Sequence, residues 1–317
     1  MTTHTTTAEN SLTVSYLTIV LALKELQDKL QSPWRGINER QQAFLARFMP
    51  LASQFTNYPV GSLTARVSNS AEVLNNLLKA NGYDIRISQL PPNGLGVVAM
   101  IDLLLHWQEA GEDEVIYRNN IDYHGVLLKK GLTTYKSPLH AHEVLKIDTK
   151  LPRFSVFMTE AARPANQFTL VDKILSVSQK LTCTNQMYDS TVATFPMVDL
   201  QQQAAIDWLL GAEIVDAGNE GYVVTQALQE NSLTINTLGT IARSGTALTM
   251  RATGKAEYKV KVINIANPFL YWIVDAACPQ LPIYMAYLDT DAWMVFDKSG
   301  FIQITNELLE RYRTAKK

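Results

Sequence analysis

The chain has 317 residues, of which 47% are hydrophobic and 18% charged, and its formal net charge is −2. A composition this rich in apolar residues excludes a disordered chain, and the small net charge gives no reason to expect a nucleic-acid partner or an anionic membrane surface. Two cysteines, Cys183 and Cys278, exclude a disulfide framework of the kind that holds small secreted domains together.

The first ten residues are rich in Thr and lack the basic-then-apolar order of an export signal. No apolar run reaches the length that a membrane span requires. We therefore expect no membrane partner, and a location in the cytoplasm or outside the cell by a non-classical route.

Two helices are predicted near the N-terminus. Ser11–Leu30 carries apolar residues at helical spacing with charged residues opposite, which favours an ordinary core-facing helix over a partner-binding or membrane-surface helix. Pro33 ends this pattern, and Asn38–Phe48 predicts a second helix. We assign residues 1–60 to a helical N-terminal extension and residues 61–317 to the main domain.

The next segments alternate between helical and extended patterns. Ser70–Ala80 predicts a Ser-capped helix with one apolar face, and Ile85–Ile87 predicts a short strand. Leu95–Trp107 is continuously apolar and is interpreted as a buried helix. Gly111–Asn120 is a polar break.

The remaining elements are mostly extended. The alternating, β-branched run Leu233–Ile241 predicts a strand, and Leu170–Leu181 predicts a short helix. The two densest apolar runs, Pro268–Ala277 and Leu281–Leu288, predict a buried hairpin. Between Leu233–Ile241 and this hairpin lies a long connection with several lysines, and connections of this length inside a compact domain are usually functional or disordered.

Catalytic patterns are absent from the sequence. It contains no glycine-rich phosphate loop, no Gly-x-Ser-x-Gly and no His-Glu-x-x-His. His140 and His142 could share one face of a strand, but a metal site needs three or four converging ligands, so a surface pair is the favoured interpretation. Cys183 has no signature of a nucleophile, and a buried inert thiol is the favoured interpretation. We expect no enzyme, no cofactor and no metal.

The C-terminal third resembles the serpins. Thr240–Ala247 (TIARSGTA) stands where that family has an acidic Gly-Thr hinge, and Asn267–Ile273 (NPFLYWI) is similar to the Pro-Phe-Leu strand that follows the family's reactive-centre loop. Fainter similarities extend over about half of the chain: Val126–Gly131, Glu143–Ile147 and Phe154–Met158 resemble a segment and two strands from the middle of the family, and Phe195–Leu200 with Ile206–Gly211 resembles a later strand and the helix after it. The middle is shorter than in the family, and residues 1–60 have no counterpart. The resemblance implies an α+β fold with a mixed central sheet, flanking helices, a C-terminal β-hairpin and an exposed loop at residues 244–265.

The resemblance also implies site residues within this loop. In an inhibitory serpin the target protease cleaves the loop, which then inserts into the central sheet as a new strand. A basic residue at the cleaved bond would suit a trypsin-like protease, although lysines also keep an exposed loop soluble. The implied positions are the hinge residues Gly245, Thr246 and Ala247, the scissile bond Lys259–Val260, and the alternative bait residues Lys255 and Lys261.

The hinge departs from the family's pattern in ways that oppose insertion. Leu248 and Met250 stand where the family has small residues, and overpacking a core costs about 1–3 kcal/mol per site. Arg251 would become a buried charge without a partner if it turned inward. The sequence therefore favours a non-inhibitory or degenerate serpin-like protein that binds a protein partner. The alternatives are a serine protease inhibitor that uses loop 244–265 as bait for a trypsin-like protease, and an unrelated α/β enzyme.

Overall fold

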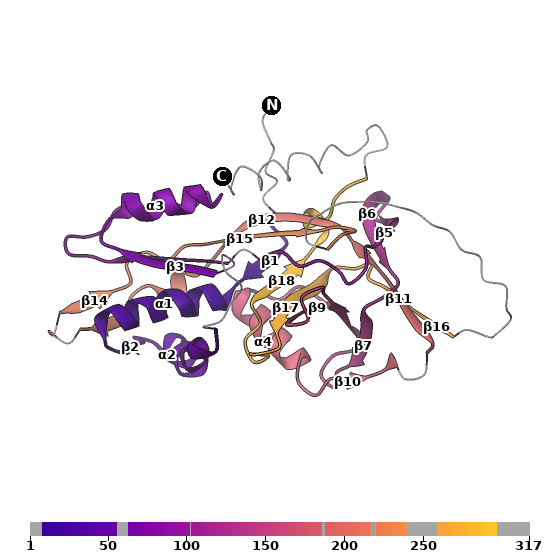
Figure 1. Cartoon of the computed structure of the whole chain (residues 1–317), viewed down its shortest axis with the longest axis horizontal. Coiled ribbons are helices and arrows are strands. Elements are labelled where there is room, and N and C mark those ends of the chain that lie inside the picture. The colour runs from indigo at the N-terminus through magenta and orange to yellow at the C-terminus, as the bar shows by residue number, and fades with distance from the viewer. Residues whose placement is uncertain are drawn as a thin grey trace, which may run out of the picture.

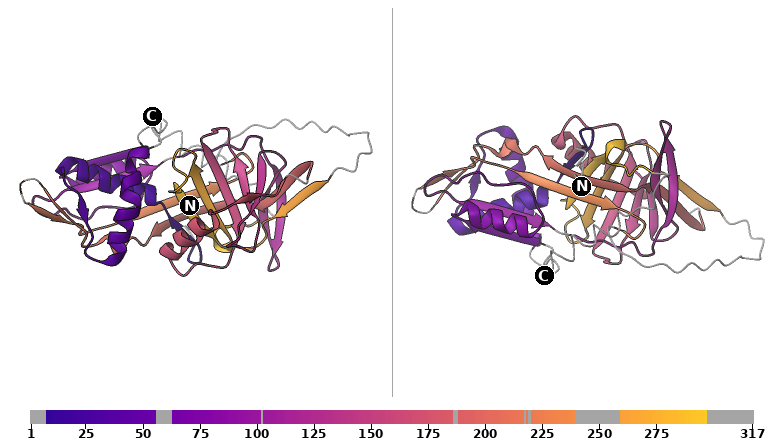
Figure 2. Two further views of the ribbon diagram at one scale, coloured as in Figure 1. Left: turned by 90° about the horizontal axis from the view of Figure 1, so that it is seen from below. Right: turned by 90° about the horizontal axis from the view of Figure 1, so that it is seen from above.

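The computed structural model describes residues 8–55, 63–101, 103–185, 188–216, 218, 220–239 and 259–296. Figure 1 shows an elongated molecule, with helices gathered at one end and the larger sheets at the other. Long strands run between the two ends, and the two views of Figure 2 show the same division.

The largest sheet has seven strands in the order β1-β18-β17-β9-β8-β7-β10, and every pair in it is antiparallel. Its strands are β1 (Leu12–Val14), β7 (Leu132–Lys136), β8 (Val144–Asp148), β9 (Phe154–Glu160), β10 (Thr182–Cys183), β17 (Phe269–Asp275) and β18 (Tyr284–Leu288). Strands β17 and β18 are buried along almost their whole length. This pair confirms the predicted C-terminal hairpin.

A second sheet has the order β16-β11-β6-β5 and mixes parallel with antiparallel pairing. Its strands are β5 (Glu112–Arg118), β6 (Ile121–Leu128), β11 (Ser190–Pro196) and β16 (Val260–Asn264). Strand β16 pairs in parallel with β11, while the other pairs are antiparallel. This combination of mixed sheets with a few helices confirms the α+β class.

Two separate ribbons of two strands form the middle of the molecule. They are β12 (Val198–Ala204) with β15 (Gln229–Ile235), and β3 (Leu63–Ser68) with β4 (Gly96–Ile101). Among the described residues, β4 and β15 belong to no common sheet, so each has one strand edge without a neighbour. A small sheet of β2 (Trp34–Arg35), β13 (Glu213–Val215) and β14 (Gly221–Val223) lies beside them.

The helices begin where the sequence offers capping side chains. Ser15, Asn38, Ser70 and Asn166 each accept a backbone N–H bond in the first turn of the helix that comes next. The helices are α1 (Tyr16–Leu30), α2 (Glu39–Phe48), α3 (Ala71–Ala80) and α4 (Gln167–Val177), with 3-10 segments at Met49–Phe55, Asp207–Leu209 and Thr290–Ala292. These elements confirm the helices predicted around Ser11–Leu30, Asn38–Phe48, Ser70–Ala80 and Leu170–Leu181. The first three begin later than predicted, whereas α4 both begins and ends earlier.

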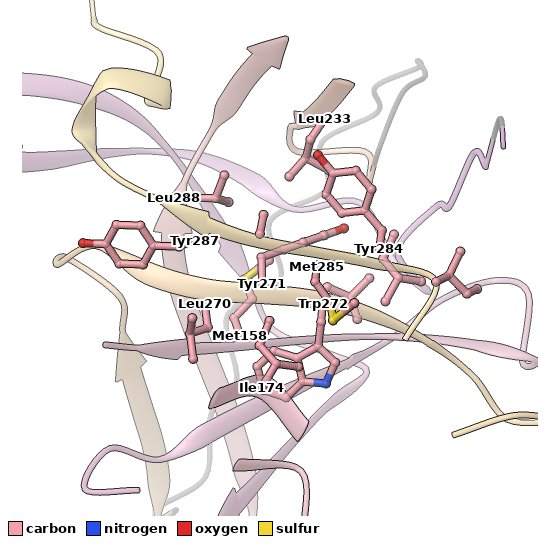
Figure 3. Packing of buried hydrophobic residues seen from close by; sticks show 14 of the residues in the cluster. Met158, Ile174, Leu233, Leu270, Tyr271, Trp272, Tyr284, Met285, Tyr287 and Leu288 are labelled. Atoms are coloured by element: carbon pink, nitrogen blue, oxygen red, sulfur yellow. The ribbon is translucent and has the colours of Figure 1, made fainter. Parts of the chain in front are cut away.

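One hydrophobic cluster runs through most of the fold, with β17 and β18 at its centre (Figure 3). Trp272 of β17 stacks on Phe157 of β9 with ring centroids 5.3 Å apart. Residues of β1, α1 and α2 belong to this same cluster. The division of the chain at residue 60 stays a prediction, but the described residues before it share the core of those after it.

Several predicted elements in the middle were wrong. Leu95–Trp107 is not a helix, because Gly96–Ile101 forms strand β4, whose alternate residues Val98 and Met100 are buried against α3. The polar break at Gly111–Asn120 contains strand β5 and its turn into β6, and Ile85–Ile87 is not assigned to a strand. Strand β15 also begins earlier than predicted and ends at Ile235 instead of Ile241.

Candidate functional site: the ends of the loop and the central cavity

The long connection leaves the fold at a tight junction that we call the clasp, formed by residues 105–107 and 236–239. The backbone N–H of Trp107 donates to the Leu238 carbonyl at 3.3 Å, and the Trp107 indole N–H donates to the Asn236 carbonyl at 3.0 Å. A β-bridge joins His106 to Gly239. Because Trp107 is buried, the clasp fixes the point at which the loop begins.

Gly239 allows the two segments of the clasp to approach this closely. Its φ angle is +123°, a conformation that residues with a side chain rarely adopt. A Cβ atom built there would lie 2.3 Å from the Leu105 carbonyl oxygen and 2.7 Å from the His106 Cα. The clasp therefore depends on glycine at this position.

The other end of the connection is held against strand β11. Lys259 donates its backbone N–H to a carboxylate oxygen of Asp189 at 2.9 Å, and its carbonyl accepts from the Asp189 N–H at 3.0 Å. Val260 then opens β16 opposite Ser190. The bond Lys259–Val260 thus lies where the chain rejoins a sheet.

Lys261 belongs to β16, and its side chain is buried on the inner side of the strand. Its side chain is 8% exposed, and its Nζ donates to Glu143 Oε1 at 2.6 Å and to the hydroxyls of Thr134 and Thr184 at 2.9 Å each. The ammonium also lies 5.3 Å from the centre of the Tyr188 ring. These contacts tie the edge strand β16 to residues on and beside β7, β8 and β10.

A cavity of about 420 Å³ is lined by the whole of β4 and by the first half of β15. The floor is the apolar face of α1, including Ile19, Leu23 and Leu26. We call this space the central cavity. Segments 83–95 and 220–228 complete its walls.

A polar bridge crosses from β15 to the segment after α3. One carboxylate oxygen of Glu230 accepts the backbone N–H groups of Asp84 and Ile85, both at 2.8 Å, and the other accepts from Gln201 at 2.6 Å. The Ser88 N–H donates to the Gln226 side chain at 3.2 Å. This bridge ties the side of the cavity formed by segment 83–95 to β15.

A buried polar network lies below β15. The Gln229 side chain accepts the Ser15 N–H at 3.1 Å and donates to the Ser15 carbonyl at 2.8 Å, while Asn231 donates to the Thr13 hydroxyl at 3.1 Å. Because buried polar groups are costly when left unpaired, these bonds fix β15 relative to the start of α1.

The site residues predicted from the sequence are only partly described by the structure. Gly245, Thr246, Ala247 and Lys255 lie outside the described residues. Lys259 and Val260 lie at the base of the loop, and Lys261 lies in the buried contacts described above. Sequence reasoning did not find the parts played by Trp107, Gly239 and Glu230, because they depend on contacts between distant segments.

The other candidate side chains are dispersed. His140 shares its Nε2 with the Thr159 hydroxyl and the Glu160 carbonyl, at 2.9 and 3.0 Å, and its ring lies 5.6 Å from that of His142. Cys183 is exposed, so the expectation of a buried thiol there was wrong, whereas Cys278 is buried. No group of three or more potential metal ligands is found in the described part of the chain.

No family model matches the sequence, and no curated protein matches it. The structure, however, is similar to many solved serpins. It matches tengpin, a thermophilic serpin in its native state, with a TM-score of 0.61 at 12% identity, covering 89% of each chain. It matches Serpin48 from the insect Tenebrio molitor with a TM-score of 0.54 at 12% identity, covering 88% of this chain and 92% of the other.

A third similar structure is human thyroxine-binding globulin in complex with its ligand, with a TM-score of 0.54 at 10% identity, covering 87% of this chain and 91% of the other. Together these matches show that the chain has a serpin-like fold. The similar proteins include a protease inhibitor as well as a binding globulin. Among the described helices, none has the length and apolar character needed to cross a membrane.

Proposed function

We propose that this chain is a non-inhibitory serpin-like protein that binds a protein partner through the edge strand β16 and the loop before it. The observation that carries the proposal is the way in which the base of the loop is held. A serine protease must accommodate residues on both sides of the bond that it cleaves. Here the residues after Lys259 are already part of a sheet, and Lys261 is buried and ion-paired.

The outer face of β16 supports a role in binding. Val260 is 44% exposed and Val262 is 68% exposed, and β16 is the last strand of its sheet. An edge strand with outward apolar side chains can add an extended segment of another protein by backbone hydrogen bonds, with the side chains providing specificity.

The alternative function is inhibition of a protease, with Lys255 as the bait residue at the cleaved bond. That residue precedes β16 by several positions in the sequence, so cleavage there would not fall within the strand. Lys261 is a poor bait, because its ammonium would have to leave Glu143 and two threonine hydroxyls before entering a specificity pocket. The departures at Leu248, Met250 and Arg251 oppose the insertion that inhibition requires.

Incubation with trypsin and related proteases tests the proposal. We expect cleavage within the loop, mapped by mass spectrometry, with no covalent complex that survives SDS. The matched variant is Lys255→Gln, which should move or abolish the first cleavage while leaving the fold unchanged. A stable protease complex that is lost in this variant would establish the inhibitor instead.

A further inference from the structure

The backbone of β16 turns one set of its hydrogen-bonding groups away from the sheet. The carbonyl of Lys259 and the N–H of Ile265 both bind residues on or next to β11, at 3.0 and 2.8 Å. Because backbone groups alternate in direction along a strand, the odd-numbered residues of β16 face β11. The even-numbered residues, Val260, Val262 and Asn264, therefore direct their N–H and C=O groups outward from the edge of the sheet.

The side chains on this edge are apolar and exposed. Val262 is 68% exposed, more than any other large apolar side chain in the described part of the chain, and Val260 is 44% exposed. A strand edge that combines free backbone groups with β-branched apolar side chains is a template for pairing with another strand. The structure thus offers both the hydrogen bonds and the apolar contact that such a strand requires.

We propose that the partner of β16 is a second copy of this chain, whose own β16 pairs with it antiparallel across a two-fold axis, with Val262 opposite Val262. This inference rests on the proposed function, because it names the partner of the same strand. In this register Val260 lies opposite Asn264, and every outward residue of β16 exchanges backbone hydrogen bonds with the other copy in both directions. Two-fold, self-complementary pairing is the commonest arrangement of identical chains.

Charge and length select this register over its neighbours. Centring the pair on Lys261 would place the two lysines directly opposite each other, and like charges in that position are destabilising. Centring it on Ile263 would leave Val260 opposite a residue outside β16. With Val262 at the centre, each Lys261 lies opposite Ile263 of the other copy.

Lys261 does not prevent the pairing. An inward-pointing charge on an edge strand usually opposes the addition of another strand, because the new strand would bury that charge. Lys261 is already only 8% exposed, and its ammonium lies 2.6 Å from Glu143, so an added strand would bury no unpaired charge. The formal net charge of −2 also keeps the long-range repulsion between two copies small.

The experiment measures the mass of the full chain in solution over a range of concentrations by sedimentation equilibrium, and we expect the parent to dimerise. Val262→Lys and Val262→Asp each place like charges opposite each other across the axis, and each should weaken dimerisation by about tenfold or more. An equimolar mixture of the two variants should recover the dimer, because opposite charges then face each other. This recovery requires position 262 to lie opposite itself.

A second pair of variants tests the backbone. Val262→Pro removes an outward N–H that pairing with β11 does not use, so it should abolish the dimer and leave the fold intact. Val262→Thr is the matched control, since it keeps the N–H and a branched side chain, and it should dimerise like the parent. Unfolding curves show whether each variant is folded, and the charge mixture remains decisive if the proline variant is not.

The proposal is overturned if the parent stays monomeric, if the charged variants dimerise as well as the parent, or if their mixture associates no more tightly than either variant alone. A monomeric parent that takes up an extended segment of a different protein at β16 would exclude the second copy and leave the proposed function standing. A dimer that forms an SDS-stable complex with trypsin would support the pairing and contradict the proposed function instead.

Discussion

The ammonium of Lys261 lies 2.6 Å from a carboxylate oxygen of Glu143, and this ion pair joins the end of the loop connection to the body of the fold. Lys261 is 8% exposed and Glu143 is 29% exposed. Strand β16 lies at the edge of its sheet, where β11 is its one neighbour among the described strands. The pair therefore adds a second attachment for the base of the loop, through a buried side chain.

Replacing Lys261 by Met should lower the free energy of unfolding. The change leaves Glu143 and two threonine hydroxyls without their cation, and we expect a loss of about 1–3 kcal/mol, below that of a fully buried pair because Glu143 is partly exposed. Urea unfolding measures the loss. Adding Glu143→Gln should recover part of it, and Lys259→Met, at an exposed position, is the control. An additive double-mutant cycle would show that the pair does not contribute.

The clasp provides a second prediction. Gly239→Ala should destabilise the protein by about 1–3 kcal/mol, because φ is +123° and the new Cβ would meet the Leu105 carbonyl. Hydrogen exchange at the Trp107 N–H should become faster as the clasp opens. Gly221→Ala is the matched control, since no atom lies within 4 Å of its added Cβ. Equal exchange rates in the two variants would contradict the role given to Gly239.

The stability of the protein should fall in mild acid because of His124. This side chain is buried against Phe296, with ring centroids 4.6 Å apart, and burial lowers its pKa while the Asp113 carboxylate opposes the shift. The unfolded chain therefore takes up a proton more readily than the folded one. The contribution of neutral His124 to the free energy of unfolding is fully present above about pH 6.5, which is the pKa of His in the unfolded chain. It is lost as the pH falls toward the lower pKa that His124 has in the folded protein.

Melting temperatures measured between about pH 7.5 and 5.5 check this dependence. His124→Phe keeps a ring against Phe296 and should flatten the curve. Some slope should remain, because burial also lowers the pKa of His140. Identical slopes in the parent and the variant would show that His124 does not carry the effect.

The C-terminal hairpin and the capped helices could be predicted from the sequence because their signals are local. The hairpin of β17 and β18 arises from two dense apolar runs around a Cys-Pro-Gln turn, and the helices after Ser15, Asn38 and Ser70 arise from capping residues and apolar periodicity. The serpin-like fold could be predicted from the order of motifs around the loop. In these places local preference and the final structure agree.

The middle could not be predicted, because its apolar runs fit a helix as well as a strand. The run that contains β4 became a strand by pairing with β3, whose residues were assigned to no element from the sequence. The central cavity arises because the ribbon of β3 and β4 does not pair with the ribbon of β12 and β15, and no local sequence pattern indicates this. The clasp depends in the same way on Trp107 meeting residues more than a hundred positions later.

Cutting the loop should have little effect on stability. Trypsin nicking between Gly254 and Lys261 should leave the melting temperature almost unchanged. Insertion of the freed segment would gain backbone bonds on the open edges of β4 and β15, and would bury apolar surface at about 25 cal/mol per Å². Insertion is opposed by the clasp at Trp107, by the hydrogen bonds of Glu230 and by the size of the incoming side chains.

We expect the opposing terms to prevail, because insertion has to break the clasp and must then bury either Leu248 and Met250 or the charge of Arg251. Calorimetry of nicked and intact protein measures the difference. Gly239→Ala, which opens the clasp, serves as a companion variant. If nicking raises the melting temperature by tens of degrees only in this variant, the clasp is the barrier to insertion. A rise of that size in the parent would mean that the loop inserts freely, and would favour the inhibitor over the binding protein.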